Sequence, residues 1–130
     1  MAEQHISEAL KQFIREKIQT VLRLEVLLLL HHQQSRSFSV VEVANELDFE
    51  KEAAQVHLTA LEEIGLVVHS NTDKPKYRYH PANATLRSMV EQLAVGYSKQ
   101  RVPILSVILA RHPDRPRVFA EAFRIIRRND

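Results

Sequence analysis

Cysteine and tryptophan are absent from this 130-residue sequence, and glycine and proline are scarce, with two and five residues respectively. Without a thiol, the chain can form neither a disulfide nor a thiolate-based zinc or redox site. Glycine and proline mark turns and loops, so their scarcity favours long helices over many short strands. Gly65 and Gly96 stand far apart, which excludes a glycine-rich loop that binds phosphate.

Long apolar runs are also missing. The longest strictly apolar run, Val26 to Leu30, has five residues, whereas a helix that crosses a bilayer needs about 20. The opening residues "MAEQHISEALKQF" include acids and lack the apolar stretch of a secretory signal. With 45% hydrophobic and 26% charged residues, the composition is that of a folded domain. We therefore expect a cytoplasmic protein with no membrane partner.

The seven histidines show no metal-binding pattern. His31 and His32 are adjacent, so on a helix they point to different sides, and no H-E-x-x-H spacing occurs. His69 and His80 could face each other across a hairpin, but two histidines alone are more typical of a polar rim than of a metal site. No local Ser/His/Asp motif is present either. We therefore predict that the protein is not an enzyme and has no catalytic residues, metal or cofactor.

Charge is distributed unevenly along the chain. The net charge is +2, but residues 37–69 carry one lysine against seven acids, which gives −6. Residues 99–130 carry eight basic residues against three acids, which gives +5. The basic pI of about 9.1 is typical of proteins that bind nucleic acid. Most of the basic charge nevertheless lies outside the acidic segment.

The first third of the chain is predicted to be helical. Apolar residues recur every three or four positions over residues 6–33, with Gln19-Thr20 as a candidate break. The stretch "LEVLLLL" (24–30) is apolar on nearly all sides, which predicts a buried central helix. The stretch "QQSRSFS" (33–39) that follows is predicted to be a polar linker.

Two helices joined by a tight turn are predicted next. Ser39 can cap the first of them, and Glu42 can reach back to the cap. Asp48-Phe49 forms the predicted turn, and the second helix should run from about Glu50 to Ile64. Gly65 follows directly, where a left-handed residue can end the helix without steric cost.

The remaining segments combine a hairpin with further helices. The stretches "LVVHS" (66–70) and "KYRYH" (76–80) are β-branched or alternating and predict two short strands. Asn83 can cap a long helix to about residue 110, with a kink or short break near Val102 because of Pro103. A last helix is predicted after Asp114.

The spacing of small and apolar residues within residues 44–67 identifies a known pattern. Its members are Ala44, Leu47, Ala54, Leu58, Leu61 and Gly65-Leu66-Val67. In this register, residues 20–80 resemble a winged helix-turn-helix domain of the MarR/ArsR-like kind. The resemblance implies a mainly α fold, in which three helices and a two-stranded β-hairpin form the winged core and additional helices flank it.

The flanks extend the resemblance. "LEVLLLL" (24–30) and "RPRVFAEAFRII" (115–126) resemble a group of short bacterial winged-helix proteins of uncharacterised role. In MarR/ArsR-like proteins, helices outside the winged core commonly form a dimer interface, so the resemblance implies a homodimer. We accordingly divide the chain into an N-terminal helical extension (1–19), the winged helix-turn-helix domain (20–82) and C-terminal helices for dimerisation (83–130).

The resemblance also implies double-stranded DNA as a partner and a role in transcription regulation. The positions that would face the groove are Lys51, Glu52, Ala53, Gln55, Val56 and Thr59. Of these, Gln55 can read adenine, and Thr59 can touch the backbone or a thymine methyl. Lys74, Lys76 and Arg78 lie in or beside the hairpin, where a wing contacts the DNA backbone. Alternation places Tyr77 and Tyr79 on the other face, as cover for the core.

The second predicted helix departs from the family pattern. Glu50 stands where the family usually has a capping Ser or Thr, and Glu52 and Val56 replace polar or basic side chains. Carboxylates in a first turn stabilise the helix by about 0.3–1 kcal/mol each, but they oppose phosphate contact. The alternative function is therefore a protein-interaction module that does not read DNA. In that case the acids, Glu50, Glu52, Glu62 and Glu63, would face a basic protein partner.

The strongest basic cluster lies near the end of the sequence. Its members are Arg111, Arg115, Arg117, Arg124, Arg127 and Arg128. It could contact DNA, an acidic protein or the acidic surface of a second copy, or it could form a solvated helix face.

Overall fold

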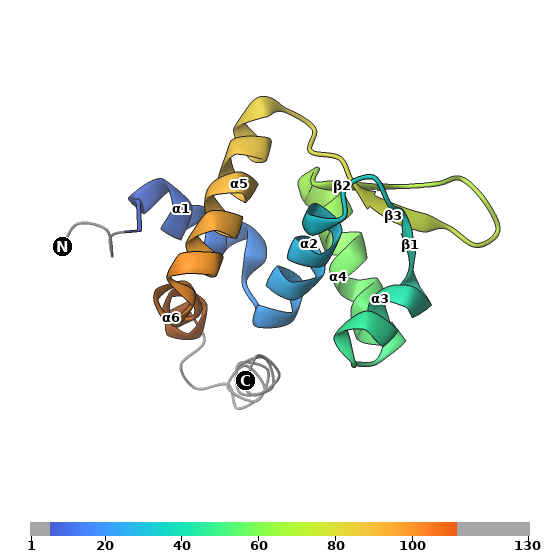
Figure 1. Cartoon of the computed structure of the whole chain (residues 1–130), viewed down its shortest axis with the longest axis horizontal. Coiled ribbons are helices and arrows are strands. Elements are labelled where there is room, and N and C mark those ends of the chain that lie inside the picture. The colour runs from blue at the N-terminus through green and yellow to red at the C-terminus, as the bar shows by residue number, and fades with distance from the viewer. Residues whose placement is uncertain (1–5, 112–130) are drawn as a thin grey trace. The chain divides into compact units, whose positions relative to one another are not determined.

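The computed structural model describes residues 6–111 (Figure 1). The elements in chain order are α1 (Glu8–Phe13), the π-helix η2 (Ile14–Ile18), α2 (Val21–His32), β1 (Phe38–Ser39), α3 (Val40–Leu47), α4 (Lys51–Ile64), β2 (Val67–His69), β3 (Lys76–Tyr79), α5 (Ala84–Lys99) and α6 (Arg101–Arg111). This order confirms the predicted mainly α, winged-helix class. The helix predicted after Asp114 lies outside the described residues. Among the described helices, none has the length and apolar character needed to cross a membrane.

The chain divides into two compact units. Within the described residues, one comprises residues 6–22 and 89–111, and is called here the helical unit; the other comprises residues 23–88, and is called the winged unit. The domain boundaries expected from the sequence stay a prediction.

Helix α2 supplies the centre of the winged unit. Leu24, Val26, Leu27 and Leu30 are completely buried, as expected for a helix that is apolar on several sides. Its last turn reaches the sheet, because the ring of His31 meets the ring of Tyr79 edge-on at 5.2 Å between centroids. The central burial predicted for this segment is confirmed.

Helices α3 and α4 form the predicted helix-turn-helix. The hydroxyl of Ser39 accepts a hydrogen bond from the Glu42 N–H at 3.1 Å, and the Glu42 carboxylate accepts one from the Ser39 N–H at 2.9 Å. This is the predicted capping box. Asp48 then adopts the left-handed region, with φ 60°, and ends α3. The inner face of the pair contains small residues, Ala44 and Ala54, which allow the two helices to approach closely.

The sheet has three antiparallel strands in the order β1-β3-β2, so the predicted hairpin carries one additional strand. Phe38 pairs with Tyr77, and its side chain is completely buried. The prediction of a polar linker over residues 33–39 is therefore wrong for its last two residues. An aromatic side chain supplies apolar area to the core, and pairing covers the second edge of β3. The guanidinium of Arg36 lies over the Phe38 ring at 4.1 Å.

The register of the hairpin separates two histidines that could have faced each other. Val67 pairs with Tyr79, so His69 lies opposite Tyr77, with ring centroids 5.5 Å apart. The His80 N–H instead donates to the carbonyl of Leu66 at 2.9 Å. His69 and His80 therefore do not face each other, because the strands are offset. Across residues 6–111, no group of three or more His, Asp or Glu side chains could hold a metal ion.

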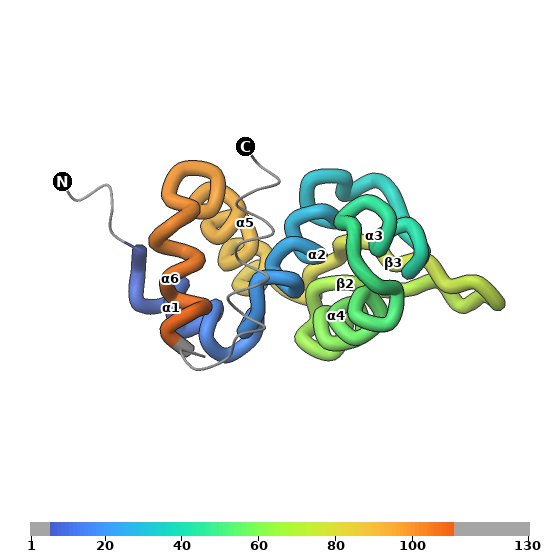
Figure 2. The backbone as a smooth tube through the Cα atoms, turned by 90° about the horizontal axis from the view of Figure 1, so that it is seen from below, coloured from blue at the N-terminus to red at the C-terminus, as the bar shows by residue number. Residues whose placement is uncertain are grey.

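The helical unit contains α1, η2, the greater part of α5, and α6, and α6 packs against η2 (Figure 2). Gln19, with φ 69°, ends η2 and produces the break predicted at this position. A second break, at Gln100, separates α5 from α6. Pro103 then falls in the first turn of α6, where its missing N–H removes no helical hydrogen bond. The predicted interruption near Val102 is confirmed.

Gly65 provides a test of how α4 ends. Its φ is 99°, and a Cβ atom there would lie 3.3 Å from Ala82 Cβ and 3.4 Å from Leu86 Cδ1. We expect Gly65→Ala to lower the free energy of unfolding by at least about 1–2 kcal/mol, because a side chain in the left-handed region is strained. Urea unfolding measures the change.

Gly96→Ala is the matched control. Gly96 lies within α5, and an added Cβ would be 3.4 Å from Ile104 Cδ1, an ordinary contact. This variant should match the wild type or gain up to about 1 kcal/mol from helix propensity. Equal stability of the two variants would contradict the role assigned to Gly65.

Candidate nucleic-acid interface

Strand β3 separates basic from aromatic side chains. Lys76 and Arg78 are exposed, whereas Tyr77 and Tyr79 are buried. The strand alternation causes this division, and it confirms that the tyrosines cover the core. Lys74 is exposed in the turn between β2 and β3, which projects from the winged unit at the right of Figure 1. The backbone thus places three cations along one wing.

The base of the wing is organised by Glu42. Its carboxylate lies 3.9 Å from the Lys76 Nζ and 3.8 Å from an Arg36 guanidinium nitrogen. The backbone hydrogen bond from Ser39, followed by the charges of Lys76 and Arg36, holds the pKa of Glu42 below its usual range. Glu42 is therefore ionised at neutral pH. Glu42, which completes the capping box of α3, thereby positions two cations, one from β3 and one from the segment that leads into β1.

These ion pairs leave the cations available. The side chains of Arg36 and Lys76 are 44% and 52% exposed, and exposed pairs contribute only about 0–1 kcal/mol. A phosphate can therefore compete for both side chains. The sequence indicated Lys76, but it did not indicate Arg36, because the role of Arg36 depends on the strand β1 that was predicted as linker.

The three candidate side chains of α4 lie on its exposed surface: Lys51, Gln55 and Thr59. The Gln55 amide nitrogen donates to Thr59 Oγ1 at 3.1 Å and to the Tyr77 hydroxyl at 3.0 Å. The first bond lies within α4, and the second joins α4 to the wing. To read adenine with both amide atoms, Gln55 would have to exchange its internal bonds for bonds to the base. The assignment of these residues to DNA contact stays a prediction.

The start of α4 is acidic and exposed. Glu50 occupies the N-cap position but its side chain makes no capping hydrogen bond. Glu50 and Glu52 both face solvent at the N-terminal end of the helix, where a phosphate would otherwise bind. Two apolar side chains are also exposed on the helix-turn-helix, since Val41 and Val56 are 52% and 59% accessible. This mixture of acids and valines differs from the basic wing.

The inner side of α4 contains a polar contact. His57 is buried at 7% exposure, and the Nε of Arg23, from α2, donates to its Nδ1 at 3.4 Å. Burial lowers the pKa of Arg23, and the charge of Glu63 opposes this shift. His57 lies three residues after Ala54 and so belongs to the inner face, a position that its spacing in the sequence could have indicated. The contact helps to hold α4 on α2 and faces away from the candidate interface.

The predicted basic cluster at the end of the sequence, from Arg115 onward, lies outside the described residues. The same holds for the side chain of Arg111, which ends α6. The candidate interface within the described residues therefore consists of the wing and the helix-turn-helix.

Comparison with known proteins supports the fold. No family model and no curated protein matches the chain. Among solved structures, the chain is similar to reduced HlyU from Vibrio cholerae N16961, with 22% identity, coverage of 76% of this chain and all of that chain, and a TM-score of 0.53. This similarity shows a shared winged-helix fold. Because this chain has no cysteine, it cannot have a reduced or an oxidised thiol state of its own.

Proposed function

We propose that the protein is a DNA-binding transcriptional regulator of the winged-helix type that acts as a homodimer. The observation that carries this proposal is the wing. Lys74, Lys76 and Arg78 are exposed along one hairpin, and Glu42 holds Lys76 and Arg36 at its base. Cations in this arrangement suit a row of phosphates, and phosphate contacts supply most of the affinity of a DNA-binding protein.

In this proposal α4 contributes little to affinity and more to discrimination between sequences. Lys51, Gln55 and Thr59 are the side chains that would approach the bases. The exposed Val56 can contact a thymine methyl group, because apolar side chains favour that contact. Glu50 and Glu52 repel phosphates, so the start of α4 should stay away from the backbone. The wing then sets the position of the domain on the duplex.

The proposed role also fits the other expectations. A regulator that binds DNA must be located in the same compartment as the DNA. The predicted cytoplasmic location agrees with this requirement. It requires neither a catalytic residue nor a cofactor.

A second candidate function is a protein-interaction module. The exposed Val41 and Val56 favour it, because both lie on the helix-turn-helix, which also carries the acids Glu50 and Glu52. A surface that combines apolar side chains with carboxylates can bind a basic amphipathic segment of another protein. The two functions predict opposite effects of the same substitution. Glu50→Gln together with Glu52→Gln should strengthen binding to DNA but weaken binding to a basic protein.

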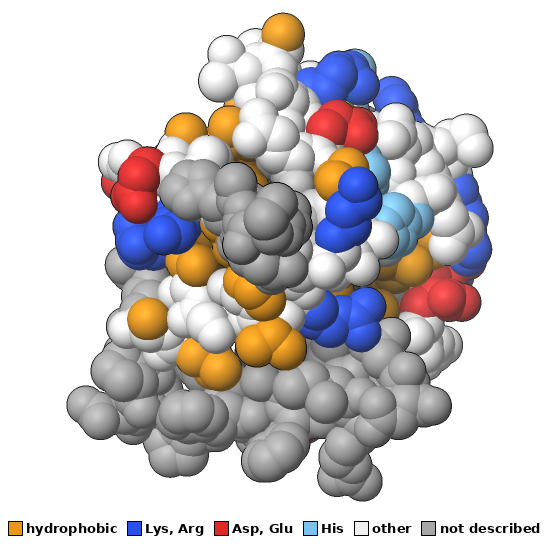
Figure 3. Space-filling model, turned by 60° about the vertical axis from the view of Figure 1, so that its left-hand side comes forward, with side chains coloured by type: hydrophobic (Ala, Val, Ile, Leu, Met, Phe, Trp, Pro, Cys, Tyr) orange, Lys and Arg blue, Asp and Glu red, His pale blue; other side chains and the backbone are white. Residues whose placement is uncertain are grey.

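The proposed homodimer rests on the helical unit. Val95 of α5 and Val102 of α6 are 52% and 67% exposed, although valine is usually buried. Exposed hydrophobic side chains also gather at the lower left of the face drawn in Figure 3. Exposed apolar side chains on helices outside the winged core are suited to contact with a second copy.

The wing is tested by replacing both Lys76 and Arg78 with alanine. We expect weaker binding to every duplex and a shallower dependence of affinity on salt. The logarithmic slope should fall by about 1 for each phosphate that the variant no longer binds. Fluorescence anisotropy with two unrelated duplexes measures both quantities. Lys99→Ala is the control, because Lys99 is exposed at the end of α5, outside the winged unit. If the double variant and the control bind equally well, the wing is not the contact surface.

The dimer is tested by light scattering at tens of micromolar protein. The wild type should have twice the chain mass of 15.0 kDa, and a variant with Val95→Glu and Val102→Glu should have the mass of one chain, because a buried unpaired charge is strongly unfavourable. Val56→Glu serves as the control and should remain dimeric. A wild-type mass of one chain would refute the homodimer.

A further inference from the structure

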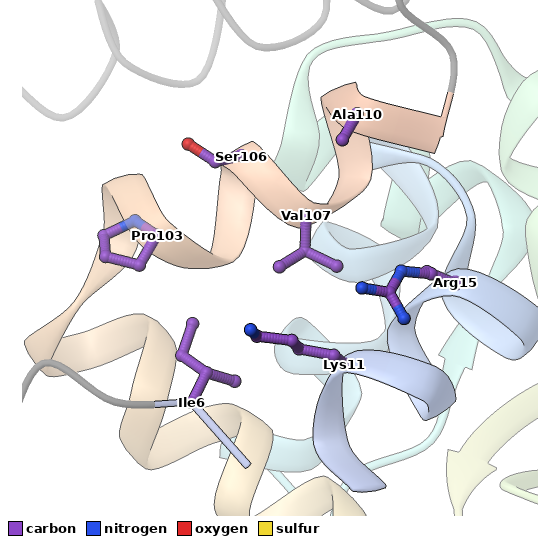
Figure 4. Close-up of a pocket in the computed structure, with 7 residues that line it drawn as sticks. All are labelled: Ile6, Lys11, Arg15, Pro103, Ser106, Val107 and Ala110. Atoms are coloured by element: carbon purple, nitrogen blue, oxygen red, sulfur yellow. The ribbon is translucent and has the colours of Figure 1, made fainter. Parts of the chain in front are cut away.

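The helical unit contains a cavity that the proposed DNA contact does not use. Its volume is about 380 Å³, and it lies among α1, η2 and α6. The lining residues are Ile6, Lys11, Arg15, Pro103, Ser106, Val107 and Ala110 (Figure 4). Cavities that bind small molecules have volumes of roughly 300–1,000 Å³ and are mostly apolar, with a few polar groups. This cavity meets both criteria.

Two cations lie on one side of the cavity. Lys11 belongs to α1, and Arg15 lies four positions later, within η2. In Figure 4 the guanidinium of Arg15 points toward Val107 of α6, and the Lys11 side chain extends below Val107 toward Ile6. The π-helix widens the turn that carries Arg15, and π-helical turns often occur at functional sites. The two positive charges thus line the same cavity from one stretch of helix.

The charges in this space are incompletely neutralised. Lys11 is paired with Glu8 at 3.6 Å, but the Glu8 side chain is 81% exposed, so the pair is weak. Within residues 6–111, no carboxylate forms an ion pair with Arg15. An anion that enters the cavity can therefore gain attraction from both side chains. The planar guanidinium of Arg15 can also bind both oxygens of a carboxylate.

The opposite walls are apolar. Ile6, which is 7% exposed, and the α6 residues Pro103, Val107 and Ala110 present carbon atoms to the cavity. The hydroxyl of Ser106 points away from the cavity in Figure 4. A bare phosphate or sulfate would leave these walls without contact. A ligand with both an anionic end and an apolar body would use the cations and the walls together.

We propose that this cavity binds a small amphipathic carboxylate, such as a medium-chain fatty acid. The carboxylate contacts Lys11 and Arg15, and the apolar body lies against Pro103 and Val107. This site is separate from the winged unit, so its occupancy can be measured without DNA and does not depend on the proposed regulator function.

The proposal is tested with octanoate as the probe, by isothermal titration calorimetry on the full chain without DNA. Octanol, which has the same apolar body but no charge, and butyrate, which has the charge but a short body, are the comparison ligands. We expect octanoate to bind at least tenfold more tightly than either. Absence of octanoate binding, or equal affinities for octanoate and octanol, would overturn the proposal.

Variants test whether the binding occurs at this cavity. Arg15→Gln and Lys11→Gln should each weaken octanoate binding about tenfold and leave the affinity for octanol nearly unchanged. Both side chains lie at the surface of the helix, so folding should be retained, and circular dichroism checks this. Lys99→Gln is the matched control, because it removes a cation that does not line the cavity. Equal octanoate binding by the Arg15 variant and the control would place the ligand elsewhere and refute the assignment.

Discussion

The winged unit depends on the burial of α2, a helix that is apolar on several sides. Such a helix is stable only when other elements enclose it, because each exposed leucine would lose about 1.5–3 kcal/mol of hydrophobic stabilisation. The enclosing elements can be identified from two contacts. His31 meets Tyr79 of β3, and Arg23 meets His57 of α4. The sheet and the helix-turn-helix therefore take their positions from the same buried helix.

Burial of the tyrosines then determines where the wing places its charges. Since Tyr77 and Tyr79 face the core, the alternate residues Lys76 and Arg78 must face solvent. The Tyr77 hydroxyl is also hydrogen-bonded to Gln55, so the strand that presents the cations is tied to α4. The acids at the start of α4 are thus held in one unit with a basic wing. A ligand of this unit must tolerate both charges, and a duplex can do so if it meets the wing and avoids the carboxylates.

Features set by local chemistry could be predicted from the sequence. The capping box of Ser39 and Glu42, the left-handed Gly65 and the interruption around Pro103 each depend on a few neighbouring residues. The strand at Phe38 and the offset of His69 from His80 depend on pairing between segments far apart in the sequence, and local patterns do not specify that register. The candidate site follows the same division. Alternation predicted the exposed face of β3, but the contacts of Arg36 and Gln55 required the three-dimensional arrangement.

The central claim is that the basic wing outweighs the acidic start of α4 and allows the protein to bind DNA. The most direct test is fluorescence anisotropy of the full chain with a mixed-sequence duplex, at about 50 and about 200 mM salt, because phosphate contacts make affinity fall steeply as salt rises. The account predicts binding at the lower salt concentration and a marked loss at the higher one. Absence of binding at both concentrations would contradict it and would favour the second candidate function, a protein-interaction module.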